Sequence, residues 1–245
     1  MRALADSLVA VLLAPLCAAC DAPLDAPTHG AVCGSCWSGV RPFLPPVCSH
    51  CGDPLPSWRH LSLEHELCPR CRRIDSALSS VRAIGPYEGS LRAIVHALKY
   101  DRRRSIAPRL GDLMRVAARD LLIDVDVAVP VPLHWRRRQA RGFNQAEDLA
   151  PALGVPVMKA LKRVRATTTQ TDLPAARRHA NVRGAFRLRW RTNVAGLRVV
   201  LVDDVCTTGA TLEACATVLR EAGAEDVRAV TAARVASPLP ESRRR

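Results

Sequence analysis

The stretch from Val199 to Thr211 constrains the fold of this 245-residue chain more than any other. It opens with apolar, mostly β-branched residues, which predict a buried strand of the kind found in parallel sheets. Asp203 and Asp204 follow where we expect that strand to end, and Gly209 then precedes the start of a helix. Ligands of open α/β sheets bind beyond the carboxyl ends of the strands, and the N–H groups at a helix start bind phosphate. Because neighbouring carboxylates can accept hydrogen bonds from vicinal hydroxyls, we predict a site for a ribose phosphate.

A simpler interpretation of this stretch is that Asp203 and Asp204 only cap the following helix. Two adjacent carboxylates at the end of a buried strand are costly when they lack a partner. We therefore favour the ligand site over the cap.

Four C-x-x-C pairs in the first third of the chain predict a metal-binding module. Two residues between the cysteines let a tight turn direct both sulfurs at one tetrahedral ion, and two such pairs complete a four-sulfur site. We expect two zinc ribbons, although an interleaved pairing satisfies the spacing equally well. The eight cysteines are Cys17, Cys20, Cys33 and Cys36 for one site, and Cys48, Cys51, Cys68 and Cys71 for the other. Disulfides and an iron–sulfur cluster are the competing interpretations. A small module of this composition buries little core, so zinc would supply folding energy, and one or two structural ions are expected.

The charge balance favours ligands that carry phosphate. The chain has 36 Lys and Arg against 23 Asp and Glu, for a net charge of +13, and only Lys99, Lys159 and Lys162 are lysines. The guanidinium group is planar and suits phosphate oxygens, so phosphate-rich ligands or nucleic acid are plausible partners. A bias of genome composition accounts for the ratio of Arg to Lys but leaves the excess of positive charge unexplained.

The N-terminus has an apolar run from Leu8 to Leu16. It is shorter than the roughly 18 apolar residues that a transmembrane helix needs. A signal peptide is disfavoured because Asp6 interrupts its amino end and because Leu16 is a poor residue before a lipidated cysteine. We expect a short helix that packs on the body of a cytoplasmic protein with no transmembrane segment.

The remaining pattern alternates strands and helices, which is typical of an α/β fold with a parallel sheet. In the helix at 106–122 we expect Leu110, Leu113, Val116, Ala117 and Leu121 to face the core. The first expected elements are a strand and turn at 81–89, helices at 91–99 and 106–122, a strand at 125–132, a basic loop at 133–145 and a helix at 144–153. A short strand from 155, a mobile loop at 167–173, a helix at 175–180 and a strand pair turning near 193–196 are expected next. The strand from 199, a helix to 221 and a strand at 227–235 complete the pattern. The expected domains are an apolar helix at 1–16, a double zinc ribbon at 17–75, an α/β domain at 80–236 and a disordered basic tail at 237–245.

Residues 199–211 resemble the thirteen-residue signature of the type I phosphoribosyltransferases, with Cys206 in place of the usual aliphatic residue. The wider pattern, from about 17 to 235, resembles the ComF family, which is associated with competence. The motifs that carry this resemblance are the four C-x-x-C pairs, Tyr87-Glu88-Gly89, Leu98-Lys99-Tyr100, Val129-Pro130-Val131-Pro132, Arg141-Gly142-Phe143-Asn144-Gln145, the residues Gln170, Leu173, Arg178, Asn181, Val182 and Phe186, and the Asp203-Asp204 stretch. The implied fold is that of a type I phosphoribosyltransferase, a parallel sheet with a hood, preceded by the double zinc ribbon.

This resemblance also implies roles for individual residues. Asp203 and Asp204 would bind ribose hydroxyls, directly or through magnesium, and Thr207, Thr208, Gly209, Ala210 and Thr211 would hold the 5-phosphate of phosphoribosyl pyrophosphate. The 133–145 segment would hold pyrophosphate, and residues 165–186 would form a hood and flexible loop. Candidates for these two roles are Lys99, Arg141, Gly142, Asn144, Gln145, Gln170, Arg178 and Asn181. From its position, Lys99 either reaches a phosphate or interacts with the negative end of its own helix.

Two functions remain open at this point. One is a magnesium-dependent enzyme that transfers phosphoribosyl to an unknown nitrogenous acceptor, with loop closure excluding water. The other is a non-catalytic protein that uses the same fold to handle single-stranded DNA during uptake, either alone or with the DNA-uptake machinery. Because only 4% of the residues are aromatic, such DNA binding would depend on backbone contacts and weaken steeply with salt.

Overall fold

A parallel sheet of four strands forms the centre of the protein, in the order β1-β6-β5-β2. The structure is a computed structural model that describes residues 2–55, 67–165 and 184–235. The strands are β1 (Ser80–Pro86), β2 (Val127–Pro130), β5 (Arg198–Cys206) and β6 (Asp226–Arg234). Residues 199–202 of β5 are fully buried, as their apolar run predicts for a central strand covered on both faces.

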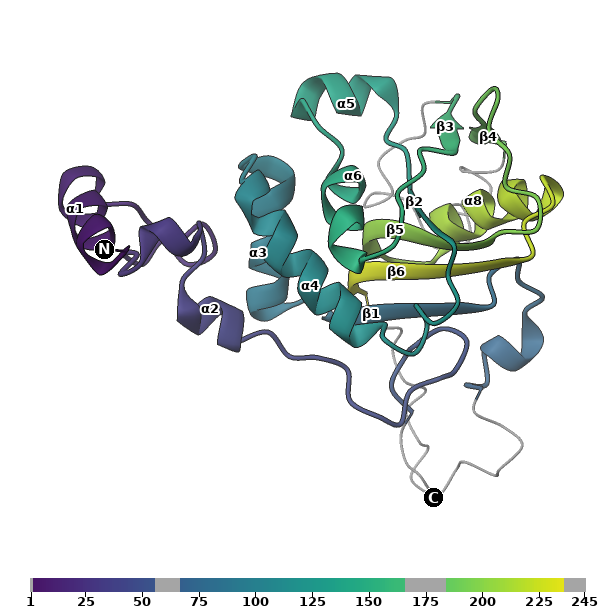
Figure 1. The fold of residues 1–245 in the computed structure, drawn as a ribbon. Coiled ribbons are helices and arrows are strands. Elements are labelled where there is room, and N and C mark those ends of the chain that lie inside the picture. The colour runs from purple at the N-terminus through teal and green to yellow at the C-terminus, as the bar shows by residue number, and fades with distance from the viewer. Residues whose placement is uncertain (1, 56–66, 166–183, 236–245) are drawn as a thin grey trace, which may run out of the picture.

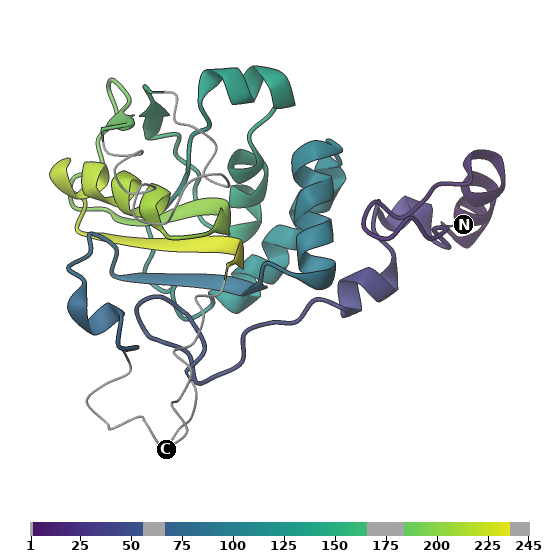
Figure 2. The same cartoon turned by 180° about the vertical axis from the view of Figure 1, so that it is seen from behind.

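Helices cover both faces of this sheet (Figures 1 and 2). One face packs on α3 (Gly89–Tyr100), α4 (Ala107–Ala117) and α6 (Gln145–Leu149). The other face packs on α8 (Ala210–Glu221) and on a small antiparallel pair formed by β3 (Leu161–Arg163) and β4 (Phe186–Leu188). A short 3-10 helix, η4 (Arg104–Ile106), precedes α4. Another, η5 (Ala150–Leu153), follows α6. The result is a three-layer α/β domain.

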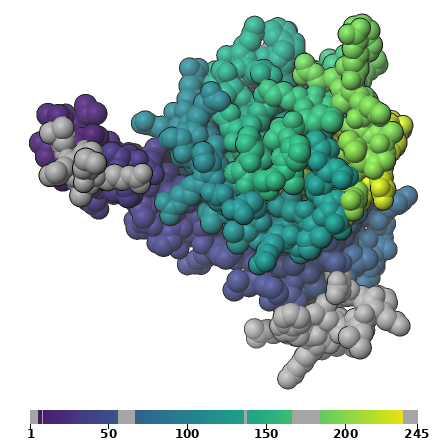
Figure 3. Space-filling view, in the orientation of Figure 1, coloured from purple at the N-terminus to yellow at the C-terminus, as the bar shows by residue number. Residues whose placement is uncertain are grey.

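Two cysteine modules precede this domain. The first contains η1 (Pro27–His29) and α2 (Gly34–Ser38), and the second ends in η3 (Cys71–Arg73). We call residues 17–38 the first ribbon and residues 48–73 the second ribbon. The first ribbon projects from one side of the molecule, whereas the second lies along β1 (Figures 1 and 3).

The N-terminal helix α1 (Arg2–Leu13) forms where an apolar helix was expected, but the prediction that it packs on the body of the protein is wrong. It contacts the first ribbon at η1, where Asp6 accepts hydrogen bonds from the backbone and the hydroxyl of Thr28. Val11, Leu12 and Leu13 are 83%, 69% and 74% exposed, because the helix lies at the far end of the first ribbon from the sheet (Figure 1). Within the described residues, none of the helices combines the length and apolarity needed to cross a membrane.

Several other expectations are corrected by the structure. The basic segment predicted as a loop contains α5 (Trp135–Arg141), because Arg, Gln and Ala are good helix formers whatever their charge. Strand β4 pairs with β3 rather than turning back onto β5. Val116 is 69% exposed, since it lies two residues beyond the buried Met114 and therefore on the opposite side of α4.

Candidate functional site

The loop between β5 and α8 lies at the carboxyl edge of the sheet, where ligands of parallel sheets bind. Thr207, Thr208 and Gly209 form this β5–α8 loop, and Gly209 takes a left-handed φ of 81° at the N-cap of α8. Glycine adopts that conformation without steric cost, which explains its presence here. Ala210 and Thr211 open the helix, so the N–H groups of its first turn start directly at the loop.

The two carboxylates stand before this loop and point to opposite faces of the sheet. Strand β5 continues through both aspartates to Cys206, beyond the expected end, because it still pairs with β6 there. Side chains alternate along a strand, and Val200 and Val202 belong to the core on the α3 side while Val199 and Leu201 belong to the core on the α8 side. Asp204 therefore faces α3, and Asp203 faces α8 and β3.

Lys99 supplies the partner of Asp204. Its Nζ lies 2.8 Å from Asp204 Oδ1, and both side chains are almost fully buried. Burial by itself would lower the pKa of Lys99, but the Asp204 carboxylate outweighs it and the pKa lies above its ordinary value. The structure thus gives Lys99, in the last turn of α3, a carboxylate partner that neither of its two predicted roles included.

Asp203 has a different electrostatic environment. Burial, followed by the neighbouring charge of Asp204, raises the pKa of Asp203 from 3.8 to about 7. The positive charges of Lys99 and of Arg163, on β3, act against this rise. The site accordingly holds one carboxylate in an ion pair and a second that ionises near neutral pH.

The basic segment after β2 lies beside the same edge, because β2 is the neighbour of β5 and Val131 N–H donates to the carbonyl of Val202. Arg141 lies over the ring of Tyr100, the residue after Lys99, and donates to Gln145 Oε1 at 3.2 Å. The segment is therefore brought next to the end of α3.

Two of the predicted pyrophosphate candidates are buried in this arrangement. Asn144 caps α6 and donates its Nδ2 to the carbonyl of Val131 at 3.0 Å, and Gln145 is 1% exposed. The Asn144 side chain thus holds the start of α6 at the end of β2. Gly142 follows α5 with a φ of 82°, which reverses the chain toward α6.

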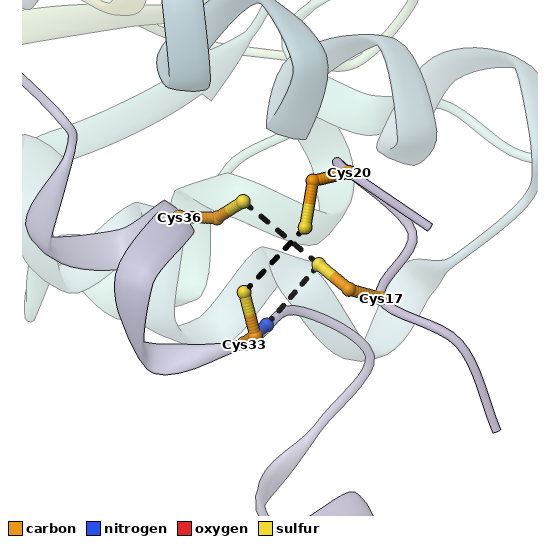
Figure 4. Close-up of side chains that lie close together, drawn as sticks. All are labelled: Cys17, Cys20, Cys33 and Cys36. Carbon is orange, nitrogen blue, oxygen red and sulfur yellow. Dashed lines mark hydrogen bonds between the residues drawn. The ribbon is translucent and has the colours of Figure 1, made fainter. Parts of the chain in front are cut away.

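The eight cysteines form two separate tetrads in sequence order, Cys17, Cys20, Cys33 and Cys36 in one and Cys48, Cys51, Cys68 and Cys71 in the other. Figure 4 shows the first tetrad, in which the four sulfurs turn toward one another. The Cys17–Cys36 and Cys20–Cys33 sulfurs are 3.9 and 3.7 Å apart, and the Cys51–Cys68 sulfurs are 3.8 Å apart. A tetrahedral zinc with Zn–S bonds of about 2.3 Å places its sulfurs about 3.8 Å apart, so the donors fit this ion.

The same distances decide between the alternatives left by the spacing. They are far longer than a disulfide, and all ten cysteines are free thiols. All four sulfurs of each tetrad also lie within 4.8 Å of one another. A 4Fe–4S cluster binds each sulfur to a different iron and a 2Fe–2S cluster shares one iron between only two of the four, so a single ion fits these tetrads better. The interleaved pairing is wrong as well, because each tetrad takes two consecutive C-x-x-C pairs.

Comparison with known proteins agrees with this division. Residues 8–72 match the family model of the double zinc ribbon domain, and residues 139–244 match that of the phosphoribosyl transferase domain. The DNA utilization protein YhgH of Salmonella typhimurium is 37% identical over 222 residues, which cover 86% of this chain and 93% of that protein. Competence protein F of Haemophilus influenzae is 32% identical over the same shares of both chains. This chain belongs to the ComF family.

The competence protein ComFC of Bacillus subtilis is a more distant ComF relative, 27% identical over 78% of this chain and 79% of its own. The expected fold class, a phosphoribosyltransferase-type parallel sheet after a double zinc ribbon, is confirmed. Five of the residues that the ComF pattern singles out lie outside the described residues, namely Gln170, Leu173, Arg178, Asn181 and Val182. The predicted loop at 167–173, the helix at 175–180 and the tail at 237–245 lie outside them as well.

Three residues near the β5–α8 loop of this ComF chain have no signal in the sequence pattern. Arg234 ends β6 and is 4% exposed, Asp53 follows the Cys48/Cys51 pair, and Arg70 lies between Cys68 and Cys71. They meet at the loop only because the second ribbon folds back along β1. No local motif marks such contacts, since their partners are more than a hundred residues apart.

Proposed function

We propose that this ComF chain binds phosphoribosyl pyrophosphate, or a related ribose phosphate, together with magnesium at the β5–α8 site. One observation carries the proposal: two carboxylates at the carboxyl edge of the sheet lead directly into a glycine turn and the start of α8. The turn offers backbone N–H groups to the 5-phosphate, and Asp203 and Asp204 offer acceptors to the two ribose hydroxyls. The names of the relatives, a DNA utilization protein and a competence protein, link the proposed role to DNA uptake.

Within this proposal, Lys99 and Asp203 contribute to ligand binding in different ways. The ammonium of Lys99 balances the charge of Asp204 and stands ready for the pyrophosphate oxygens. Asp203 offers both of its oxygens as acceptors only when it is ionised, so contacts with hydroxyls or magnesium would favour release of a proton near neutral pH. Bound magnesium would neutralise pyrophosphate charge and hold sugar oxygens.

The reaction that such a site would support is transfer of the phosphoribosyl group to a nitrogenous acceptor with release of pyrophosphate. Positively charged groups around the pyrophosphate would stabilise the leaving group. No described residue stands out as a base for one particular acceptor. Ligand binding is therefore the main proposal for this chain, and phosphoribosyl transfer is a further step that depends on it.

Calorimetric titration of phosphoribosyl pyrophosphate with Mg²⁺ into the full chain tests the binding. We expect saturable binding by wild type and at least about thirtyfold weaker binding by Asp204→Asn, because a charged acceptor in a buried site is lost. Asp120→Asn is the matched control, since Asp120 is exposed and pairs with Arg82 on the far edge strand β1. Absence of binding by wild type would contradict the proposal. If wild type binds, a screen of purine, pyrimidine and amide acceptors for pyrophosphate release tests turnover.

A second function, single-stranded DNA binding, is favoured by a basic pocket beside the same edge. The pocket has an apolar floor of prolines and leucines, and its cationic lining residues are Arg138, Lys159, Lys162, Arg163 and Arg189. Glu147 is the only carboxylate among the lining residues and already contacts Arg138 and Lys159. Trp135 on the rim is 56% exposed, and the nearby Trp190 is 84% exposed, which offers surfaces for base stacking.

Fluorescence anisotropy with a labelled single-stranded oligonucleotide tests this second function. If about three phosphates are contacted, affinity should fall by roughly tenfold or more between 50 and 200 mM salt. Arg189→Ala should weaken binding, and Arg115→Ala, whose side chain pairs with Asp112 on α4, should not. A flat salt dependence would contradict DNA binding through this pocket.

A further inference from the structure

The second ribbon is attached to the edge of the sheet by its backbone. Val81 N–H, on β1, donates to the carbonyl of His50 at 2.6 Å, and Arg82 donates to the carbonyl of Ser49 at 2.9 Å. A Cβ on Gly52 would lie 2.6 Å from the carbonyl oxygen of Val81, so only glycine permits this approach. The first knuckle of the ribbon thus covers an edge strand that would otherwise expose its hydrogen-bonding groups.

A buried ion pair continues this attachment toward the β5–α8 loop. The guanidinium of Arg234 donates through Nε and Nη2 to the two carboxylate oxygens of Asp53 in the ribbon. Its Nη1 donates to the sulfur of Cys206 at 3.3 Å, three residues before the left-handed Gly209. Burial raises the pKa of the Cys206 thiol, so this cysteine acts as a neutral acceptor. Arg234 therefore joins the ribbon to the residue at which β5 turns into the loop.

A second contact reaches the loop directly. Arg70, in the knuckle between Cys68 and Cys71, donates Nη2 to the carbonyl of Thr208 at 3.3 Å. The carbonyl of Thr208 and the N–H of Gly209 belong to one planar peptide and point in opposite directions. By holding the carbonyl, Arg70 directs the Gly209 N–H away from the ribbon, as an anion-binding turn requires.

A third contact fixes the first turn of α8. Glu213 accepts hydrogen bonds from Ser76 Oγ at 2.6 Å and from Ala77 N–H at 2.7 Å, both in the segment that follows the ribbon. The loop is therefore held before, within and after its glycine by residues that belong to the second ribbon or border it.

We propose that the second ribbon is a supporting module of the ribose-phosphate site, in which Arg70 and Asp53 are positioning residues that hold the β5–α8 loop in its anion-binding form. The expected consequence of this support, tighter binding of phosphoribosyl pyrophosphate, rests on the proposed function. The first ribbon has no such role, because no hydrogen bond or ion pair among the described residues joins it to this loop.

Calorimetry with phosphoribosyl pyrophosphate and Mg²⁺ on Arg70 variants tests the consequence. Arg70→Ala should bind about fivefold more weakly, the loss expected for one hydrogen bond, while the melting temperature stays within about 2 °C because Arg70 is exposed. Arg70→Lys, which can still donate to a carbonyl, should recover most of the affinity. Arg72→Ala is the matched control, since the side-chain hydrogen bond of Arg72 within the described part of the chain goes to the carbonyl of Leu67, inside the ribbon. Equal affinity of Arg70→Ala and Arg72→Ala would overturn the assignment.

Amide hydrogen exchange without ligand separates this inference from the proposed function. The amides of residues 208–213 should exchange about tenfold faster in Arg70→Ala and in Asp53→Asn than in wild type or Arg72→Ala. If exchange rises in this way while wild type binds no phosphoribosyl pyrophosphate, the inference stands and the proposed function fails. If wild type binds the ligand but exchange and affinity are unchanged in both variants, the proposed function stands and the inference fails.

Discussion

The two ribbons share a cysteine spacing and a four-sulfur geometry, yet they relate to the α/β domain in different ways. The first ribbon is attached by apolar packing, with Trp37 buried and Arg109 of α4 over its ring. The second is attached by backbone hydrogen bonds to β1 and by the ion pair between Asp53 and Arg234. The cysteines determine where a metal binds, whereas the residues beside them determine what the module supports.

Loss of one zinc ligand from each ribbon should produce the largest difference between them. We expect two zinc ions per wild-type chain and about one in both Cys20→Ser and Cys48→Ser, because a structural site loses its ion with a ligand. Cys48→Ser should lower the melting temperature of the whole domain by more than about 10 °C. The reason is that β1 loses its backbone hydrogen bond to the ribbon and Arg234 loses its ion pair with Asp53.

Cys20→Ser should leave the main unfolding transition within about 5 °C of wild type, because among the described residues no hydrogen bond or ion pair joins the ribbon it disrupts to the sheet edge. Metal analysis and calorimetric melting measure both effects. Equal destabilisation by the two variants would contradict the difference between the ribbons.

A conservative change of Asp53 in the second ribbon, compared with the same change of Asp6 on α1, which contacts the first ribbon, should give the next largest effect. Asp53→Asn leaves Arg234 buried without a counter-charge and should cost about 3–5 kcal/mol, a shift of roughly 10 °C. Asp6→Asn keeps an oxygen that can accept from Thr28 and should cost no more than about 1 kcal/mol. Thermal and urea unfolding of both variants measures the costs, and a small cost for Asp53→Asn would show that Arg234 does not depend on the ribbon.

The pH dependence of ligand binding should be determined by Asp203, beside the β5–α8 loop, and should be independent of the first ribbon. Asp203 has a pKa raised to about 7 by burial and by Asp204, and binding requires its ionised form. Affinity for phosphoribosyl pyrophosphate should therefore fall as the pH falls, about tenfold between pH 8 and pH 6. Asp203→Asn should flatten the profile and Asp6→Asn should preserve it; a profile that stays steep in Asp203→Asn would assign the titration to another group.

The smallest effect should come from the contact that docks the first ribbon on α4. Arg109→Ala removes a cation over the Trp37 ring, 4.6 Å from its centroid, and should cost about 0.5–1 kcal/mol. Binding of phosphoribosyl pyrophosphate should be unchanged, because this contact lies away from the β5–α8 loop. A loss of binding in Arg109→Ala would show that the first ribbon also supports the site.

The parts of this protein that were predictable from sequence are those encoded locally. The buried run of β5, the glycine turn before α8 and the C-x-x-C pairs each depend on residues within a short stretch, so spacing and periodicity predict them. Which pairs share a metal site is decided only by the fold. The end of β5 was misplaced because its last residues are held by pairing with β6, which no local pattern reports.

Contacts between segments that are far apart in the sequence could not be predicted from local sequence patterns. Lys99 was a candidate for the site, but its pairing with Asp204 depends on how α3 packs across the sheet. The same holds for Asp53 and Arg234, which are 181 residues apart. The segment at 135–141 differs from its predicted loop for another reason, because a dense run of positive charge is compatible with either a loop or a helix.

The central claim is that the second ribbon and the β5–α8 loop form one structural unit and that the first ribbon stands outside it. Amide hydrogen exchange of residues 208–213 in Asp53→Asn, in the second ribbon, and in Asp6→Asn, in the helix α1 that contacts the first ribbon, tests this claim most directly. We predict exchange about tenfold faster than wild type in Asp53→Asn and unchanged in Asp6→Asn. Equal exchange rates in the two variants would contradict it.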